Sequence, residues 1–115
     1  IRDYANFARM LLNYGAFGKT QIVSREYILQ MQTPIIGRNL MVRDYQAWGL
    51  GVRVLTDQYI LPKGCFGWSG AYGTHFWIDP ENRIYAIYMK NSMYDGGSEA
   101  KTGLAFEKAV VEAGN

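Results

Sequence analysis

One stretch, from Phe66 to Met89, constrains the fold of this 115-residue chain more than any other part of the sequence. Two runs rich in β-branched and aromatic residues, 74–78 and 84–89, flank residues 79–83, which have the Pro and Asx content of a turn. This pattern predicts an antiparallel hairpin. Glycine recurs at every third position ahead of it, at Gly64, Gly67, Gly70 and Gly73. Such spacing indicates a backbone that bends or lies close to another group, so we expect a functional site here.

Length and composition predict one domain, residues 1–115, with a modest core. Hydrophobic residues make up 49% of the chain and charged residues 19%, whereas about 25% is usual for charged residues in a free-standing domain. The composition resembles that of the interior of a larger protein. The net charge of +2 is spread along the chain, so no nucleic-acid partner is expected.

Cysteine and histidine usage limits the chemistry of the chain. Cys65 is the single cysteine and His75 the single histidine, so we expect no internal disulfide, no zinc site and no cofactor. No apolar run approaches the roughly 20 residues of a membrane span, and the first residues lack a signal-peptide pattern. Because the chain opens inside an apparent helix without an initiator Met, its start indicates a processing or expression boundary, and the compartment stays unassigned.

Apolar periodicity predicts three helices. Residues 1–13 carry an apolar face with helical spacing, formed by Tyr4, Phe7, Ala8, Leu11 and Leu12. Ser24 is expected to cap a second, short helix that Pro34 ends. Ser98 and Glu99 are expected to open a final helix. Its predicted apolar stripe consists of Ala105, Phe106, Ala109, Val110 and Ala113.

The remaining patterns predict strands and loops. Residues 47–56 alternate as a strand with one buried face does, and residues 35–46 have no period and are expected to be loop. With the hairpin, these elements predict an α+β fold in which an antiparallel sheet of three to four strands is covered by helices.

The run Phe-Gly-Trp-Ser-Gly-Ala-Tyr-Gly-Thr-x-Phe-Trp-Ile-Asp-Pro-Glu, residues 66–81, followed by an apolar strand, resembles a known family. It is similar to the carboxy-terminal part of the β-lactamase-like serine hydrolases, which include class C β-lactamases, penicillin-binding D-peptidases and related esterases. Further matches lie upstream, at Asp3-Tyr4-Ala5-x-Phe7-Ala8-x-Met10-Leu11-Leu12-Asn13 with Gly15, at Ile22-Val23-Ser24, at Met31 and at Trp48-Gly49-Leu50-Gly51-Val52. Their order is that of the family, so the resemblance covers the chain and implies the carboxy-terminal portion of a β-lactamase/transpeptidase-like fold.

Members of this family use a Ser-x-x-Lys nucleophile motif, a Tyr-x-Asn or Ser-x-Asn element and a Lys-Thr-Gly or similar triplet on a strand. Three strings in the chain match these expressions: Ser98-Glu-Ala-Lys101, Tyr4-Ala-Asn6 and Lys101-Thr-Gly103. Two of them share Lys101, and the tyrosine element precedes the serine, which reverses the family's order. We interpret all three as chance matches without their structural context.

The better counterpart of the Lys-Thr-Gly triplet is Trp68-Ser69-Gly70, because the strand beginning Gly-Thr-x-Phe-Trp-Ile-Asp-Pro follows it at the right distance. The resemblance implies that this stretch lines one wall of the substrate cleft. It also implies that the backbone N–H of Ala71 supplies half of an oxyanion hole.

The resemblance extends the wall to Tyr72 and Gly73, and one departure from the family bears on specificity. Trp68 stands where the family usually has Lys or His, which removes a cation that would pair with a substrate carboxylate and favours a neutral acyl ester. The alternative is that Trp68 and Tyr72 only pack beside a glycine-rich turn.

Two other reactive side chains are interpreted as structural. His75 could act as a general base, but it lies within an alternating strand without a recognisable serine partner. Cys65 has no His or Asn arranged nearby in sequence, which indicates a buried or half-buried thiol.

The chain is therefore interpreted as the carboxy-terminal segment of a serine hydrolase, inactive alone because the nucleophile would lie in a missing amino-terminal part. The expected partners are that missing part, or a second copy, pairing through the edge strand from Ile84 to Met89, and a small acyl substrate. The alternative is a free-standing α+β binding or interaction module whose glycine-rich loop holds a ligand.

Overall fold

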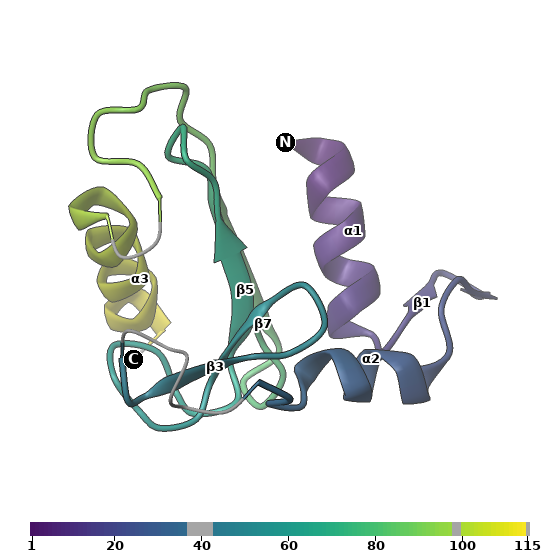
Figure 1. The fold of residues 1–115 in the computed structure, drawn as a ribbon. Coiled ribbons are helices and arrows are strands. Elements are labelled where there is room, and N and C mark those ends of the chain that lie inside the picture. The colour runs from purple at the N-terminus through teal and green to yellow at the C-terminus, as the bar shows by residue number, and fades with distance from the viewer. Residues whose placement is uncertain (37–42, 98–99, 115) are drawn as a thin grey trace.

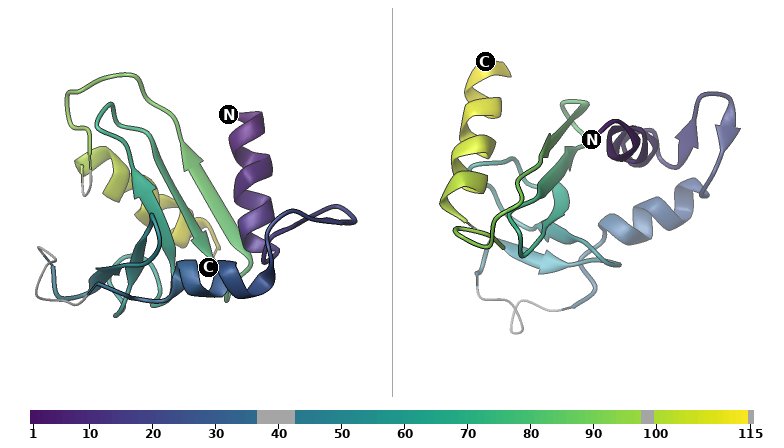
Figure 2. Two further views of the ribbon diagram at one scale, coloured as in Figure 1. Left: turned by 45° about the vertical axis from the view of Figure 1, so that its right-hand side comes forward. Right: turned by 90° about the horizontal axis from the view of Figure 1, so that it is seen from above.

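The computed structural model describes residues 1–36, 43–97 and 100–114, and it confirms the α+β class. The elements in chain order are α1 (Arg2–Leu12), β1 (Ala16–Phe17), β2 (Thr20–Gln21), α2 (Arg25–Gln32), β3 (Gln46–Trp48), β4 (Arg53–Leu55), β5 (Phe66–Ser69), β6 (His75–Asp79), β7 (Ile84–Tyr88) and α3 (Lys101–Gly114). Figure 1 shows α1 and α3 on opposite faces of the main sheet, and Figure 2 shows the same layers from two further sides.

The main sheet has five strands in the order β3-β4-β5-β6-β7, and every neighbouring pair is antiparallel. This is more than the three to four strands that we predicted. In addition, β1 and β2 form a separate two-stranded ribbon whose turn contains Gly18 and Lys19. In the described part of the chain β5 lies at the centre of the main sheet and β7 at one edge.

The single strand predicted over residues 47–56 is wrong, because the chain turns back within it to make β3 and β4. Gly51 has a φ of +73°, which an L residue rarely adopts. A Cβ at Gly49 would overlap the carbonyl oxygen of Met31, so only glycine allows this approach to α2. The Gly49 N–H closes the turn on the Val52 carbonyl oxygen at 2.9 Å. The alternating pattern concealed two short strands and their turn.

The hairpin predicted after the glycine-rich stretch is confirmed as β6 and β7. Its turn is organised by Asp79, whose carboxylate oxygen accepts from the backbone N–H groups of Glu81 and Asn82 at 3.0 Å each. The bend that the glycine spacing predicted over residues 64–73 covers fewer residues than expected, because residues 66–69 form strand β5. Gly67 is inside β5, paired with Trp77, and the turn itself comes only after Ser69.

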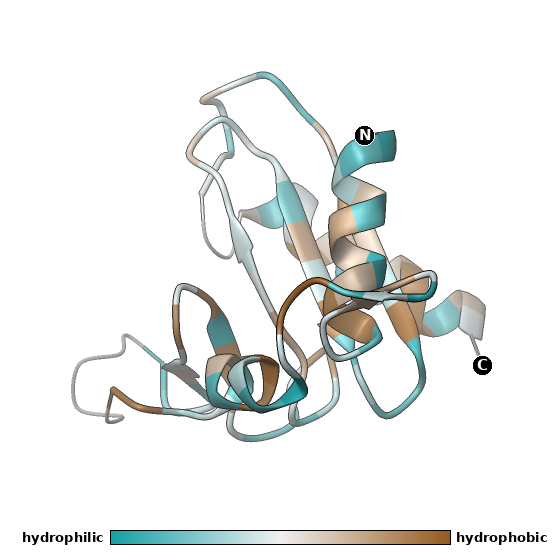
Figure 3. Cartoon of the chain, turned by 90° about the vertical axis from the view of Figure 1, so that its right-hand side faces the viewer, coloured by the Kyte–Doolittle hydropathy of each residue, from teal (hydrophilic) through white to brown (hydrophobic). Residues whose placement is uncertain are grey.

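Two apolar cores flank the sheet. The larger one joins α1 and α2 to one sheet face through side chains that include Ala8, Leu11, Ile28 and Phe66. Apolar and polar residues alternate along α1 in Figure 3, as expected for a helix with one buried face. Two members of the predicted face, Tyr4 and Phe7, remain 37% and 40% exposed near the start of α1. The second helix is capped as predicted, since the Ser24 hydroxyl accepts from the Tyr27 N–H at 3.3 Å.

The smaller core packs α3 against the opposite sheet face, where Trp77 is its largest side chain. Phe106 and Val110 take part, as predicted, but the rest of the predicted stripe is wrong. Three alanines assigned to it are exposed: Ala105, Ala109 and Ala113. A charged residue, Glu107, is buried instead, because Arg53 and His75 on the sheet pair with its carboxylate and compensate its negative charge. The predicted helix start at Ser98 and Glu99 lies outside the described residues.

No helix in the described ranges is both long and apolar enough to cross a membrane.

Gly67→Ala is expected to destabilise the chain by about 2 kcal/mol, because the new Cβ would overlap the Phe76 carbonyl oxygen across the sheet and force β5 away from β6. Gly114→Ala is the matched control, since a Cβ there meets no atom within 4 Å. Urea unfolding followed by circular dichroism measures both. Equal unfolding free energies for the two variants would contradict the described pairing of β5 with β6.

Candidate functional site

A cavity of about 400 Å³ lies between the start of α1 and the ends of β5, β6 and β7. Its lining consists of Tyr4, Trp68, Ser69, Gly70, Thr74, His75, Phe76 and Met89. This volume lies within the usual range for small-molecule sites. Among the described residues that line it, none is Lys, Arg, Asp or Glu, so the cavity suits an uncharged group.

The structure brings together part of the predicted site. Trp68, Ser69 and Gly70 line the cavity, whereas Tyr72 and Gly73 are not part of its lining. The Tyr72 side chain is 56% exposed. Gly73 has a φ of +89°, and a Cβ there would press on the Lys90 side chain. Both residues therefore shape the adjoining turn.

The sequence did not indicate the wall contributed by α1. The Tyr4 ring meets the Phe76 ring edge-on, with centroids 5.1 Å apart. Burial raises the pKa of the Tyr4 phenol, which keeps it neutral over the physiological range. Helical periodicity placed Tyr4 on the inner face of α1, but only the docking of this helix on β6 puts the ring at the cavity.

Trp68 takes part in core packing and also borders the cavity. Its half-buried ring packs against Trp48, with centroids 4.3 Å apart, and it also lines the cavity. The packing interpretation of this residue is thus correct in part.

The turn after β5 leaves one backbone donor free. The Gly70 N–H donates to the Thr74 carbonyl oxygen at 2.8 Å, which extends the ladder between β5 and β6. Ala71 is exposed, and its N–H makes no hydrogen bond to any residue in the described ranges. The group predicted to serve as an oxyanion donor is available to a ligand.

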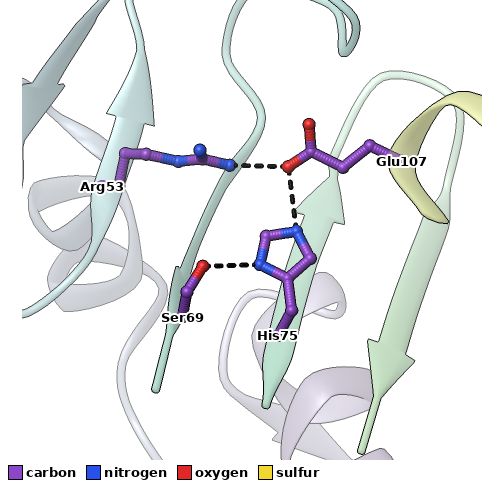
Figure 4. A network of polar contacts seen from close by, with 4 residues as sticks. All are labelled: Arg53, Ser69, His75 and Glu107. Atoms are coloured by element: carbon purple, nitrogen blue, oxygen red, sulfur yellow. Dashed lines mark hydrogen bonds and ion pairs between the residues drawn. The ribbon is translucent and has the colours of Figure 1, made fainter. Parts of the chain in front are cut away.

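Beneath the wall, four polar side chains form a buried network (Figure 4). The Ser69 Oγ lies 2.7 Å from His75 Nδ1, and His75 Nε2 lies 2.9 Å from Glu107 Oε1. The same carboxylate oxygen accepts from Arg53 Nη2 at 3.0 Å. All four residues are at most 6% exposed. In the neutral imidazole, the hydrogen on Nε2 is donated to Glu107, and Nδ1 accepts a hydrogen bond from the Ser69 hydroxyl.

A serine, a histidine and a carboxylate joined in series by hydrogen bonds are the groups of an acyl-transfer triad. Whether they can act as one depends on where the serine hydroxyl points. Successive side chains of a strand point to opposite faces. Trp68 and Phe76 face the α1 side with the cavity, so their strand neighbours Ser69 and His75 face α3. The Ser69 hydroxyl is therefore directed to the α3 side, where it is hydrogen-bonded to His75. This orientation favours a structural role for the network.

The structural interpretation of His75 is therefore supported, but the statement that it lacks a serine partner is wrong. Ser69 and His75 are directly opposite each other in the β5–β6 ladder. Pairing the predicted hairpin with the residues before it would have revealed this contact. Glu107 is 32 residues away from His75 in the chain, and no local pattern indicated it.

The network keeps Glu107 ionised. Burial alone would raise the pKa of this carboxyl, but the hydrogen bond from His75 and the positive charge of Arg53 outweigh it and hold the pKa below the usual value. The negative charge of Glu107 in turn compensates the buried guanidinium. The helix α3 is thus tied to the sheet by a paired charge.

The buried thiol is confirmed. Cys65 is 1% exposed, and burial raises the pKa of its thiol, assisted by the nearby Asp79 and Glu107 carboxylates. A thiol that stays protonated is a poor nucleophile. No cluster of three or more His, Cys, Asp or Glu suited to a metal ion occurs within the described part of the chain.

The chance matches lie in the wrong structural context. Lys101, Thr102 and Gly103 form the first residues of α3, so this triplet is helical where the family's triplet lies on a strand. Tyr4 and Asn6 lie on α1. Ser98 lies outside the described residues.

The sequence of the chain matches a known protein family and two curated proteins. The profile of the family described as Beta-lactamase matches residues 1–109. Two curated relatives from strains of Mycobacterium tuberculosis, "Uncharacterized protein MT1414" and "Protein Rv1367c", are each 27% identical to the chain over 98% of its length. The chain spans 30% of the length of these relatives.

Glu107→Gln is expected to lower the unfolding free energy by about 3 kcal/mol at pH 7, because it leaves the Arg53 charge buried without its partner. The folded-state pKa of Glu107 is below the unfolded value near 4.5. Its contribution is therefore fully present above pH 4.5 and is lost as the pH falls through the folded-state pKa.

Urea unfolding of the wild type and this variant between pH 3 and pH 7 measures the effect, and the gap between them should close in acid. Glu112→Gln is the control on the same helix, since its exposed carboxylate only approaches Lys108 at 3.8 Å. A gap of the same size at every pH would contradict the ionised network.

Proposed function

Because the chain belongs to the β-lactamase family, we propose that it is the carboxy-terminal segment of a serine hydrolase that acts on an ester, amide or β-lactam through an acyl-enzyme. One observation carries the proposal. The stretch from Trp68 to Gly70 lines the cavity, and the next residue, Ala71, has an N–H without a partner among the described residues.

The proposed contribution of the segment is one wall and half of an oxyanion hole. When a serine hydroxyl adds to an acyl carbonyl, the carbonyl oxygen becomes an anion that fixed N–H donors stabilise. The Ala71 N–H supplies one donor, and the N–H of the nucleophilic serine supplies the other. Small residues at the end of β5 allow the acyl group to approach the backbone.

The nucleophile would come from sequence outside these 115 residues. The chain spans 30% of the length of its curated relatives, which leaves room for a Ser-x-x-Lys helix and a tyrosine element. The Ser69 hydroxyl does not replace them, because it is buried on the α3 side of the sheet. The segment alone is therefore expected to be inactive.

The lining favours a neutral acyl ester. Trp68 stands where the family usually has a cation, and the aromatic rings of Tyr4 and Phe76 complete an apolar wall. An anionic β-lactam or D-peptide would find no positive charge among the lining residues of the described structure to pair with its carboxylate. The proposed parent is thus closer to esterases than to β-lactamases.

The sheet edge at β7 is the proposed docking site for the rest of the polypeptide. Its backbone faces no further strand in the described structure, and four of its five residues are only partly buried. An unpaired apolar edge favours pairing with another strand, from the same polypeptide or from a second copy.

The chain alone is expected to hydrolyse neither p-nitrophenyl esters nor a chromogenic cephalosporin above the buffer rate. A polypeptide extended upstream of Ile1 to include a Ser-x-x-Lys motif is expected to hydrolyse the ester. Ser98→Ala and Ser69→Ala variants of the chain are the controls. Turnover by the chain that either variant abolishes would overturn the proposal, since the nucleophile would then lie within these residues.

The chain alone is also expected to dimerise with rising concentration in size-exclusion chromatography, because the β7 edge has no partner strand. Met89→Lys places a charge directly after β7, where the side chain is 42% exposed, and should weaken the dimer at least tenfold. Met93→Lys, at a residue 68% exposed in the following loop, is the matched control and should leave it unchanged. A monomer at every concentration would instead favour the free-standing binding module.

A further inference from the structure

Residues 89–97, which follow β7, run alongside the turn between β5 and β6 (Figures 1 and 2). Two backbone hydrogen bonds join these segments. The Ser92 N–H donates to the Tyr72 carbonyl oxygen at 3.0 Å, and the Gly97 N–H donates to the Gly70 carbonyl oxygen at 2.9 Å. The turn that carries Ala71 is therefore held from outside its own hairpin.

The bond from Gly97 acts on the peptide unit that contains the Ala71 N–H. The Gly70 carbonyl and the Ala71 N–H belong to the same planar, trans peptide group, so they point in opposite directions. The Gly70 oxygen accepts from the Gly73 N–H as well, also at 2.9 Å. Two donors on one oxygen set the rotation of the peptide plane, and with it the direction of the free N–H on the other side.

Glycine is required at both residues of this contact. A Cβ at Gly96 would overlap the Ala71 carbonyl oxygen and come within 3.1 Å of the Gly73 nitrogen. Gly97 has a φ of +86°, in the region that other L residues rarely adopt, and has open space around it. The first glycine permits the close approach, and the second turns the backbone so that its N–H faces Gly70.

Residues 89–97 are themselves anchored at two points. The Lys90 ammonium donates to the carbonyl oxygens of Tyr94 and Asp95, at 2.6 and 3.0 Å. The Asp95 carboxylate accepts from the N–H groups of Lys101 and Thr102, at 2.7 and 2.8 Å, and so caps α3. Since α3 is tied to the sheet by Glu107, the glycine pair is held between two fixed elements.

We propose that Gly96 and Gly97 are positioning residues that aim the Ala71 N–H at the acyl oxygen. This inference rests on the proposed function of Ala71 and extends it, because it assigns the alignment of the oxyanion donor to a segment more than 20 residues away in the chain. A donor aligned before the reaction needs no reorganisation when charge develops, which is the source of its catalytic effect.

The test measures the direction of the Ala71 N–H in the chain itself. Residual dipolar couplings of ¹⁵N-labelled wild type should fit a single orientation of this bond relative to β5, with a heteronuclear NOE close to that of the strand. Gly96→Ala is expected to change the Ala71 coupling beyond experimental error and to lower its NOE, while couplings within β5 stay the same. Gly49→Ala is the control, since its Cβ also overlaps a backbone carbonyl oxygen, but that of Met31 on α2 rather than one in the turn that carries Ala71.

A second pair of variants applies if Gly96→Ala does not fold. Gly97→Ala strains a residue with a φ of +86° and open surroundings, and Gly64→Ala does the same at +88° ahead of β5. Only Gly97→Ala should alter the Ala71 coupling. Unchanged Ala71 couplings in the folded Gly96 or Gly97 variant would overturn the positioning role.

An activity measurement separates this proposal from the function on which it rests. In the upstream-extended polypeptide, Gly96→Ala should lower kcat on a p-nitrophenyl ester about tenfold or more with little change in KM, because only transition-state stabilisation is lost. If the wild-type extended polypeptide does not hydrolyse esters, the proposed function fails, and the dipolar couplings alone decide whether the glycine pair orients Ala71. Altered couplings with unchanged kcat would overturn the catalytic part of the proposal.

Discussion

The pairing of β5 with β6 is the constraint on which the rest of the molecule depends. Its register places Ser69 opposite His75 and Gly67 opposite Trp77. Strand residues alternate between faces, so a slip by one residue would turn the His75 side chain toward α1 and the Phe76 side chain toward α3. The register thus separates two environments within one sheet: an apolar wall facing α1 and a polar network facing α3. Because Gly67 has no side chain, β5 and β6 can approach closely enough to form this register.

The polar face couples the carboxy-terminal helix to the same strand pair. Glu107 could not be buried alone, because an ionised carboxylate in a protein interior requires compensation. Arg53 on β4 supplies the opposite charge and His75 on β6 supplies a hydrogen bond, so one carboxylate joins three elements. The network combines the groups of a hydrolytic triad with an orientation that hides the serine hydroxyl. Residue identity alone does not define a catalytic site; the face on which the groups lie has to be known.

The apolar face and the adjoining turn have the features that substrate recognition would need. The cavity is lined by aromatic rings from α1, β5 and β6, and the backbone beside it offers a donor that the described structure leaves unpaired. These parts are supported from outside the hairpin by residues 89–97 and by α3. A short, glycine-rich turn is flexible when isolated, and contacts with neighbouring segments are what give it one orientation.

Local patterns along the chain were enough to predict the hairpin of β6 and β7, the capped helix α2, the buried Cys65 and the family resemblance over the Trp68-Ser69-Gly70 stretch. Each of these depends on short-range patterns of apolar residues, turn residues and caps, which are readable along the chain. Three features could not be predicted in this way and became known from the folded chain: the division of residues 47–56 into β3 and β4, the inward face of α3, and the partners of His75. They depend on contacts between residues far apart in sequence, such as Gly49 with Met31 and Glu107 with Arg53, and periodicity carries no information about which distant groups will compensate a buried charge or allow a close approach.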